Sequence, residues 1–451
     1  MDIDGSTLIG WGLRPGPWFK DALARARAMA AQGLHVDDIR MAVAAMEPPR
    51  TRPKAGAAEP EALPGVVSVP GPGGIPVAIV GQHDGKTIAQ LHACARYGSV
   101  AGAALCADGH LGYAQPVGGV IAYADHISVS GVGFDIACGN MAVRTDMDAA
   151  GLDRERLNTL ADDIARGLSF GVGRTNAERV EHPVLDDGEA WRAAEAWDLR
   201  QMAANQLGTI GSGNHYVDVF ADEQERVWVG VHFGSRGLGH RTATKFLKLA
   251  GGKDGIDVPP TVLETGSEIG RRYLAAMELA GRYAYAGREW VVGKVLGMLG
   301  ARAVDTVHNH HNFAWRESHD GRDLWVVRKG ATPAFPGQRG FVGGSMGDDA
   351  VILEGVDAPE AGPLFRSTVH GAGRVFGRKE AKRRFAREEM ADWLRRRGVV
   401  LRGGGLDESP MAYRRLDEVL AAHAGTVRVL HRLRPLVVVM AGEGEVDPYK
   451  D

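Results

Sequence analysis

Cysteine and long apolar runs are the scarcest features of this sequence. Three cysteines, Cys94, Cys106 and Cys138, occur among 451 residues, and so sparse and odd a set argues against a disulfide framework and for reduced thiols. No run of about 18 or more uncharged apolar residues is present, which excludes an ordinary membrane-spanning helix. The N-terminus MDIDGSTLIG lacks the basic start and the apolar stretch of a secretory signal. We therefore expect a cytoplasmic protein without a membrane anchor.

The sequence also lacks a strong charge of either sign. A net charge of -3 gives no general attraction to nucleic acid, so a polyanionic partner needs local basic patches. Apolar residues make up 44% of the chain, enough for one big domain or two ordinary ones. Glycine is in excess, with 62 residues, roughly twice the usual share. Without a collagen period, that excess indicates many functional turns.

The chain divides by composition into three parts. In residues 1–47, the helical spacing of apolar residues predicts a small helical segment, with Pro17 near the start of a helix and Gly33 at its end. Residues 48–65 are rich in proline, alanine and charge, which is typical of a linker. From 66 to 451, strand-like and helical segments alternate. This part predicts a mixed α/β (α+β) fold, a single large domain of layered mixed sheets flanked by helices.

Within the large domain, hydrophobic patterns bounded by glycine or charge predict individual elements. Helices are expected near 189–206, 264–299 and 377–397. Strands are expected at HYVDVF (215–220), RVWVGVHF (226–233), DLWVVR (323–328), AVILEG (350–355) and LVVVM (436–440).

One cysteine lies in a glycine-rich turn beside a carboxylate. GVGFDIACGN, residues 131–140, places Cys138 three positions after Asp135. Other turns carry histidines beside glycine or asparagine: GSGNHYVD (His215), GVHFGSRGLGH (His232) and VHNHHNFAWRE (His308, His310, His311). Imidazole, thiolate and carboxylate together suit Zn, Mn, Fe or Co. Taken singly, each such residue is more often structural, but the set points to a metal site.

Strand geometry adds one expectation about the segment NHYVDV. If it forms a strand, Asn214, Tyr216 and Asp218 share one side and His215 points to the other. One strand then serves two subsites, with His215 on a metal and Asn214 and Asp218 on a neighbouring ligand.

A second group of residues, around His370, is typical of an anion-binding site. In STVHGAGRVFGRKEAKRRF, His370 lies in a Gly-Ala-Gly turn that leads into a strongly basic helix. Free N–H groups at a helix start and basic side chains favour phosphate, and a glycine loop at 328–347 adds Arg328 and Lys329. His370 is then a nucleophile or a hydrogen-bond donor. The alternative is a solvated basic helix after an ordinary turn.

Taken in order, these segments resemble the RtcB family of RNA-splicing ligases. The motifs are DGHLGYAQPVGGV, GVGFDIACGN, LGTIGSGNHYVD, VHFGSRGLGH, HHNFAWRE, RKGATPAF, GGSMG and STVHGAGRV, and the similarity spans roughly residues 66–442. The resemblance implies an enzyme with two Mn²⁺ ions that uses GTP. It joins an RNA 3'-phosphate, or a 2',3'-cyclic phosphate opened first, to a 5'-hydroxyl end in RNA repair or tRNA splicing.

The resemblance also assigns roles to residues. Cys138 bridges the two metals, Asp135 and His215 complete one site, and His232 and His311 complete the other. His370 is the nucleophile, which takes up GMP through Nε2 and passes it to the RNA 3'-phosphate; the 5'-hydroxyl then attacks and GMP leaves. Asp108, in the DGH element, is a second catalytic residue near the metals. The implied nucleotide-binding residues are Asn214, Asp218, Asn312, Gly343, Gly344, Ser345, Met346, Gly371, Ala372, Gly373, Arg374, Tyr413 and Met440. His308 and His310 are expected to be structural or to lie behind the ligands.

Positions that contact the base depart from the family pattern. Asp218 stands where the family has Glu, Met440 where it has Lys, Ala350 where it has a hydroxyl, and Gly343 where it has Pro. Loss of hydrogen-bonding partners for guanine predicts relaxed or altered nucleotide choice.

Two other functions stay open at this point. One is a metal-dependent RNA end-processing phosphodiesterase that uses the same metal centre without ligation. The other is an RNA-binding relative without turnover that acts with a protein partner. Retention of His370 disfavours the second, because a pure binder has no need of a nucleophile. An activating protein partner of the ligase is also possible on the sequence.

Overall fold

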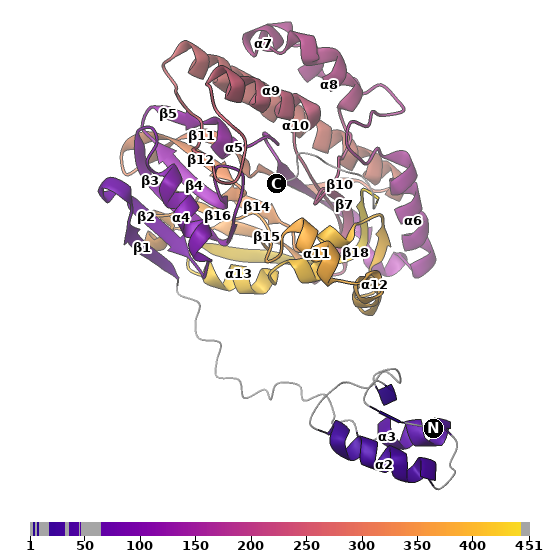
Figure 1. Ribbon diagram of the computed structural model, residues 1–451. Coiled ribbons are helices and arrows are strands. Elements are labelled where there is room, and N and C mark those ends of the chain that lie inside the picture. Colours follow the sequence, from indigo (N-terminus) through magenta and orange to yellow (C-terminus); the bar gives the residue numbers. More distant parts are fainter. Residues whose placement is uncertain are drawn as a thin grey trace. The chain divides into compact units, whose positions relative to one another are not determined.

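The computed structural model of the protein describes residues 3–4, 7–8, 18–31, 36–44, 46 and 65–442. The chain separates into two compact units, Met1–Ala62 and Leu63–Asp451 (Figure 1). In the first unit, α2 (Phe19–Ala31) and α3 (Val36–Ala44) occupy the predicted helical segment and share a small buried apolar cluster. Pro17, Gly33 and all but the last residue of the predicted linker 48–65 lie outside the described residues.

The second unit contains a six-stranded sheet in the order β1-β2-β3-β4-β12-β11. Its neighbours pair antiparallel except β2 with β3, which are parallel. The strands are β1 (Val66–Pro70), β2 (Pro76–Val80), β3 (Val100–His110), β4 (Val117–Tyr123), β11 (Asn312–His319) and β12 (Arg322–Lys329).

The larger sheet has eight strands, in the order β10-β6-β8-β7-β18-β15-β14, with β17 beside β18. Apart from the parallel pair β17 and β18, its pairs are antiparallel. The strands are β6 (Gly139–Asp148), β7 (Tyr216–Ala221), β8 (Arg226–Phe233), β10 (Ala303–His310), β14 (Arg339–Val342), β15 (Ala350–Gly355), β17 (Val400–Arg402) and β18 (Val427–Met440). Two small ladders pair β5 (His126–Ser128) with β9 (Val262–Glu264) and β13 (Ala331–Pro333) with β16 (Ser367–Val369).

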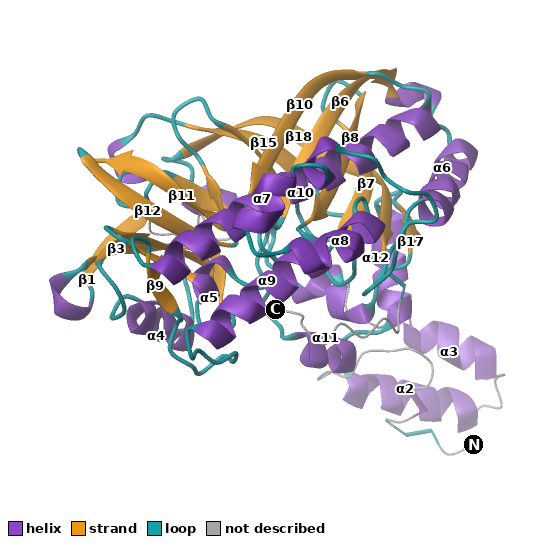
Figure 2. Ribbon diagram, turned by 90° about the horizontal axis from the view of Figure 1, so that it is seen from above, coloured by secondary structure: helices purple, strands orange, loops and turns teal. Residues whose placement is uncertain are grey.

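Helices cover the sheets. They are α4 (Gly85–Cys94), α5 (Val129–Val132), α6 (Arg154–Gly167), α7 (Gly188–Ala193), α8 (Arg200–Gln206), α9 (Arg236–Leu249), α10 (Glu268–Leu299), α11 (Arg378–Arg384), α12 (Arg387–Arg396) and α13 (Leu416–Ala422). The long helix α10 begins where the Ser267 side chain accepts the Gly270 N–H, and it ends at Gly300, whose φ of 67° suits glycine. Figure 2 shows α10 and α9 lying across the sheets, and the two helices contact each other.

The core explains this layering. Valines of β7, β8 and β18 form one cluster with Ile164 of α6 and Val291 of α10, so these two helices cover one face of the larger sheet. A second cluster joins the smaller sheet, through Val120 and Val326, to Val351 and Leu353 of the larger one. The central strands β4, β7 and β8 are buried on both faces along nearly their whole length, and their sequences are correspondingly rich in apolar residues.

The mixed α+β fold class and the single large domain that carries both sheets are confirmed, and strands occur at all five predicted places. The predicted helix 189–206 is wrong as one helix. It is divided into α7, a short 3₁₀ turn (Trp197–Leu199) and α8, because Glu195 adopts a left-handed φ of 49°. The predicted helix 377–397 is likewise two helices, since Phe385 and Ala386 are extended. The predicted helix 264–299 is confirmed and begins at Glu268.

Within the described part of the chain, none of the helices combines the length and the apolar character needed to cross a bilayer.

Candidate functional site

A single cavity of about 750 Å³ brings together the side chains that the sequence marks out. All five predicted metal ligands, all thirteen predicted nucleotide-binding residues and His370 line it. Asp108 does not line it; this carboxyl is completely buried and lies behind His370, 2.6 Å from the ring Nδ1.

Antiparallel register explains why distant residues meet at this cavity. In the larger sheet, Gly139 pairs with His310, Asn140 with His232, and His232 with Tyr216. Residues next to these pairs, including Cys138, His215 and His311, therefore gather at one edge of the sheet. Gly139 is required here, because a Cβ at this position collides with the Asn309 carbonyl oxygen.

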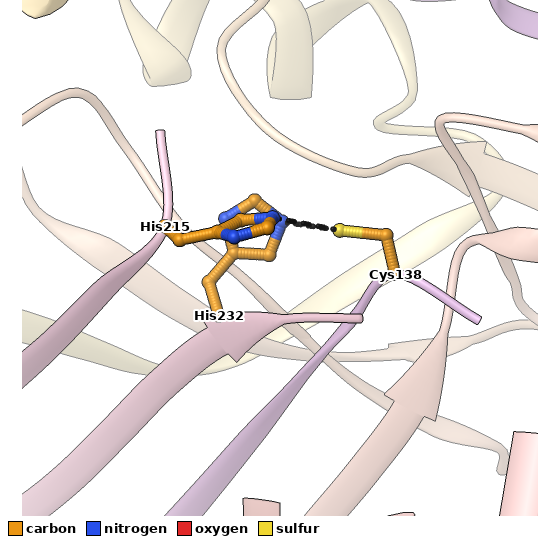
Figure 3. Close-up of side chains that lie close together, drawn as sticks. All are labelled: Cys138, His215 and His232. Carbon is orange, nitrogen blue, oxygen red and sulfur yellow. Dashed lines mark hydrogen bonds between the residues drawn. The ribbon is translucent and has the colours of Figure 1, made fainter. Parts of the chain in front are cut away.

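Cys138 is the centre of the cluster. Its Sγ lies 3.2 Å from His232 Nε2 and 3.6 Å from His215 Nε2, and Figure 3 shows both rings pointing their nitrogens at the sulfur. The three ligand atoms lie within 4.8 Å of one another, and all three residues are buried. Backbone hydrogen bonds stabilise the turn: Cys138 N–H donates to Asp135, and His311 N–H donates to the Cys138 carbonyl.

Asp135 and His311 extend the cluster on opposite sides. Asp135 Oδ2 lies 3.0 Å from His215 Nε2. On the other side, His311 Nε2 lies 3.4 Å from His232 Nε2. The contacts thus join the five side chains in a row, in the order Asp135, His215, Cys138, His232 and His311. That two metal sites share the sulfur stays a prediction of the resemblance.

The ring protons of His215 and His232 lie on Nδ1, and this placement favours binding of cations between the five side chains. His215 Nδ1 lies 3.0 Å from the Ile210 carbonyl oxygen, and His232 Nδ1 lies 3.0 Å from the Asn214 carbonyl oxygen. A carbonyl oxygen only accepts, so each Nδ1 carries the hydrogen and each Nε2 presents a lone pair. Arg236 is more distant from His215 Nδ1, at 3.5 Å. Lone pairs therefore face a carboxylate, a sulfur and another imidazole, an arrangement that metal ions stabilise.

Electrostatics agree with this assignment. Burial lowers the pKa of His232 to about 3 and lowers that of His311, so both imidazoles are neutral. Burial, with the Asp135 carboxylate beside it, raises the pKa of Cys138. The sulfur therefore becomes a thiolate only beside a cation. One sulfur, three imidazoles and one carboxylate suit borderline divalent metals such as Mn, Zn, Fe or Co.

Comparison with known proteins agrees with this geometry. A family model described as tRNA-splicing ligase RtcB matches residues 89–441. The chain belongs to the RtcB family. Among its relatives, RNA-splicing ligase RtcB1 of Escherichia coli is 32% identical over 74% of this chain and 89% of its own length. The tRNA-splicing ligase RtcB of Thermococcus kodakarensis is 32% identical over 73% of this chain and 86% of its own length. The RNA-splicing ligase RtcB of Mycobacterium bovis is 33% identical over 73% of this chain and 94% of its own length.

Membership in the RtcB family supports an RNA ligase activity, and the cluster around Cys138 fits a metal-dependent one. The nucleotide-binding residues that the RtcB resemblance implies lie in two glycine loops, 343–346 and 371–374, and around them. Arg374 of the second loop donates 3.0 Å to Glu408 and 2.7 Å to the Tyr413 hydroxyl. Its charge is therefore partly neutralised by protein.

Three details of the sequence interpretation are corrected. Strand β7 begins at Tyr216, so Asn214 and His215 lie in the preceding turn, where alternation along a strand does not set their direction. Arg328 is not an anion donor, because it is fully buried and donates 2.6 Å to Glu317. In the basic helix, Arg378 is not free for phosphate, since it pairs with Glu408, whereas Lys379, Lys382, Arg383 and Arg384 are exposed.

Sequence reasoning missed Arg288. This arginine of α10 is fully buried, and it has no carboxylate partner among the described residues. It donates to the carbonyl oxygens of Ala137 (3.0 Å) and Phe233 (2.6 Å), which adjoin Cys138 and His232. It also contacts His308 Nε2 at 2.8 Å and His310 Nδ1 at 2.9 Å, so these two histidines lie behind the ligands as predicted. A single guanidinium thus joins three of the four chain segments that carry the predicted ligands. The only sequence signal is a lone arginine in a mostly apolar stretch of the helix.

Replacing Arg288 with methionine is expected to weaken divalent metal binding about 10- to 100-fold, because second partners that orient ligands affect metal affinity by this amount. Unfolding free energy should fall by about 2–4 kcal/mol, because two buried carbonyl oxygens lose their donor. Titration with Mn²⁺ and urea denaturation measure the two effects. The control is Arg282→Met, which removes an exposed arginine of the same helix that pairs with Asp187. This variant should change the Mn²⁺ affinity and the unfolding free energy only slightly. Unchanged metal affinity in Arg288→Met would contradict the orienting role.

Proposed function

We propose that this protein is an RNA ligase that joins an RNA 3'-phosphate or 2',3'-cyclic phosphate end to a 5'-hydroxyl end through a histidine–nucleotide intermediate. It works with two Mn²⁺ ions and a nucleoside triphosphate, for which the resemblance implies GTP. The observation that carries this proposal is the placement of His370: its ring centroid lies 5.0 Å from that of His311, beside the metal cluster.

Asp108 prepares His370 for attack. Its Oδ2 lies 2.6 Å from His370 Nδ1 and also accepts the backbone N–H groups of His370 (2.9 Å) and Gly371 (3.2 Å). Burial raises the pKa of Asp108, but the adjacent His370 ring and backbone N–H lower it by more, so the pKa lies below its usual range and the group is a carboxylate. A carboxylate at Nδ1 keeps the proton there, which leaves the Nε2 lone pair as the nucleophile.

Five side chains would hold the metal ions: Asp135 and His215 on one side, His232 and His311 on the other, with Cys138 between. Bound there, the ions supply neutralisation of phosphate charge and alignment of the reacting groups. The glycine loops 343–346 and 371–374 let phosphates approach the backbone N–H groups closely. Ser345 is already oriented, because its hydroxyl donates 2.7 Å to Asp348.

Three displacements follow from this arrangement. His370 Nε2 attacks the α-phosphorus, and the bond to pyrophosphate breaks. An oxygen of the RNA 3'-phosphate then attacks the same phosphorus, and the N–P bond breaks. Finally the 5'-hydroxyl attacks the activated 3'-phosphorus, the nucleoside monophosphate leaves, and the hydroxyl proton passes to solvent.

The test is incubation of the wild-type protein with Mn²⁺, α-³²P-labelled nucleoside triphosphates, and RNA that has a 2',3'-cyclic phosphate and a 5'-hydroxyl end. We expect an acid-labile label on the protein and a joined RNA product. Opening of the cyclic phosphate with neither label nor joining would instead favour the end-processing phosphodiesterase. A cytoplasmic location and an activating protein partner stay predictions of the sequence.

Replacing Asp108 with asparagine is expected to slow nucleotide transfer to His370 about 10³-fold, because an amide no longer keeps the Nδ1 proton in place. Metal content should not change, since Asp108 contacts none of the five ligands. Single-turnover labelling and metal analysis measure the two quantities. Asp222→Asn is the matched control, because Asp222 is also buried and hydrogen-bonded, but its partners are Trp228 (3.0 Å), Arg226 and Gln224 in place of His370. Wild-type labelling by Asp108→Asn would contradict its role.

A further inference from the structure

Helix α9 forms a basic wall of the cavity. Six of its residues line the cavity: Arg236, His240, Arg241, Thr244, Lys245 and Lys248. The helix contains neither Asp nor Glu. At about 1.5 Å per residue, the wall runs roughly 18 Å from Arg236 to Lys248, which is the rise of about five stacked nucleotides at about 3.4 Å each. A wall of this charge and length suits the phosphate backbone of a nucleic-acid strand.

The basic groups of this wall are available to phosphates. Arg241 and Lys248 are exposed, and neither forms an ion pair among the residues that the structure describes. Lys245 Nζ lies 3.2 Å from a carboxylate oxygen of Glu195, but Arg272 contacts the same carboxylate at 2.6 Å. Glu195 therefore keeps a cation beside it when Lys245 turns to a phosphate.

Apolar side chains line the cavity beside the basic wall. They include Phe134, Val172, Leu199 and Met202, and the Phe134 ring stacks on that of His240 with centroids 5.3 Å apart. Cations for the backbone next to apolar and aromatic surface for the bases is the combination that binds single strands without reading their sequence. This part of the cavity therefore fits a single-stranded RNA better than a small anion.

Helix α9 and the glycine loops adjoin opposite ends of the row of predicted ligands. At one end, Arg236 Nη1 lies 3.5 Å from His215 Nδ1. At the other end, His370 lies beside His311 and leads into the glycine loop 371–374. In Figure 1, α9 lies near the top of the large domain, and α11, which follows this loop, lies in its lower half.

The last displacement of the proposed reaction determines which RNA end approaches from each side. The 5'-hydroxyl attacks the 3'-phosphorus while the nucleoside monophosphate leaves, and the attacking and leaving oxygens lie roughly in line. The glycine loops hold the leaving nucleotide. The hydroxyl must therefore arrive from the opposite end of the row, where α9 lies.

We infer that α9 binds the RNA strand that carries the 5'-hydroxyl end, with Arg241, Lys245 and Lys248 on its phosphates and the neighbouring apolar side chains on its bases. This inference rests on the proposed function and assigns one of its two RNA ends to a surface of the protein.

The experiment measures binding of two short single-stranded RNAs to the full-length protein with Mn²⁺ and without nucleotide. One RNA has a 5'-hydroxyl end and a fluorophore at its 3' end; the other has a 3'-phosphate end and a fluorophore at its 5' end. In the variant Arg241→Ala/Lys248→Ala, we expect the Kd of the 5'-hydroxyl strand to rise about 10-fold. The slope of its log Kd against log salt should fall by about 1.4, at about 0.7 for each lost phosphate contact. The Kd of the 3'-phosphate strand should change by less than about twofold.

The matched control is Lys86→Ala/Arg322→Ala. These two residues are also an exposed lysine and an exposed arginine without an ion pair among the described residues, and they do not line the cavity. Both strands should bind this variant as they bind the wild type. The inference is overturned if the wild type does not bind the 5'-hydroxyl strand, if Arg241→Ala/Lys248→Ala binds it unchanged, or if that variant weakens the 3'-phosphate strand equally or alone.

Binding without nucleotide separates this inference from the proposed function. If no triphosphate labels the wild type, the proposed function fails, and the two Kd values still decide the role of α9. If the wild type labels and joins, the KM for the 5'-hydroxyl strand should rise about 10-fold in Arg241→Ala/Lys248→Ala, and the KM for the 3'-phosphate strand should not. Joining with both KM values unchanged would overturn the role of α9 and leave the proposed function intact.

Discussion

Replacing His370 with alanine is expected to abolish both covalent labelling by nucleotide and joining of RNA ends, by a factor on the order of 10⁴ or more, because no other nucleophile replaces it. The neighbouring imidazole of His311 faces His232 at 3.4 Å and belongs to the metal cluster. His110, which also lines the cavity, has its Nδ1 2.9 Å from the Asp108 carbonyl oxygen. Intact-protein mass and autoradiography after a quench in neutral or alkaline denaturant, in which the P–N bond survives, measure the label, and a gel assay measures joining.

A control variant shows whether the loss of labelling comes from the missing nucleophile or from the removal of any histidine. His126→Ala removes a histidine that contacts Asp125 at 2.6 Å and does not line the cavity; labelling and joining should stay at wild-type rates. In the His370→Ala variant, two bound metal ions and opening of cyclic phosphate should remain, since both depend on the Cys138 cluster. Labelling that persists in His370→Ala would place the nucleophile elsewhere and remove the basis of the proposed reaction.

Replacing Cys138 with serine is expected to remove both metal ions, with an affinity loss on the order of 10³-fold or more. The sulfur contacts one histidine of each predicted metal site, at 3.2 Å from His232 Nε2 and 3.6 Å from His215 Nε2. A serine hydroxyl ionises much less readily and reaches less far than a thiolate. Metal analysis after dialysis measures stoichiometry. Because a ligand that binds only the folded state stabilises it, Mn²⁺ should raise the Tm of the wild type and not that of Cys138→Ser.

Cys106→Ala is the matched control for that experiment. Cys106 is fully buried like Cys138, but it packs in the apolar cluster between the two sheets. Its replacement should cost about 1–2 kcal/mol of unfolding free energy and leave both metal ions bound. Two bound ions in Cys138→Ser would show that the sulfur is not shared, and one bound ion would restrict its role to a single site. Chelation of the wild type should abolish labelling, and added Mn²⁺ should restore it.

The side chains that line the site could be predicted from the sequence, because they occur in short motifs at the ends of apolar segments. Cys138, His215 and His311 each adjoin glycine or asparagine, and His232 has a glycine two positions away on either side. Such residues mark places where a chain turns and a side chain is exposed to a ligand. The strands β8 and β15 were predicted with their observed bounds. Helix boundaries were less predictable, since the break at Glu195 depends on one residue with a left-handed backbone.

What the sequence determined by itself was the identity of the reactive groups and the order of the elements, because side-chain chemistry and hydrophobic period are local properties. Only the tertiary structure decided which of those groups touch. Cys138 and His215 are separated by 77 residues and meet through the register of a sheet. The motifs do not show that the backbone carbonyls of Ile210 and Asn214 orient the rings, and Arg288, which joins three of the ligand segments, lies outside the motifs. The burial that raises the pKa of Asp218 likewise depends on the neighbouring strand β18, because proton affinity is set by surroundings in space and not by neighbours in the chain.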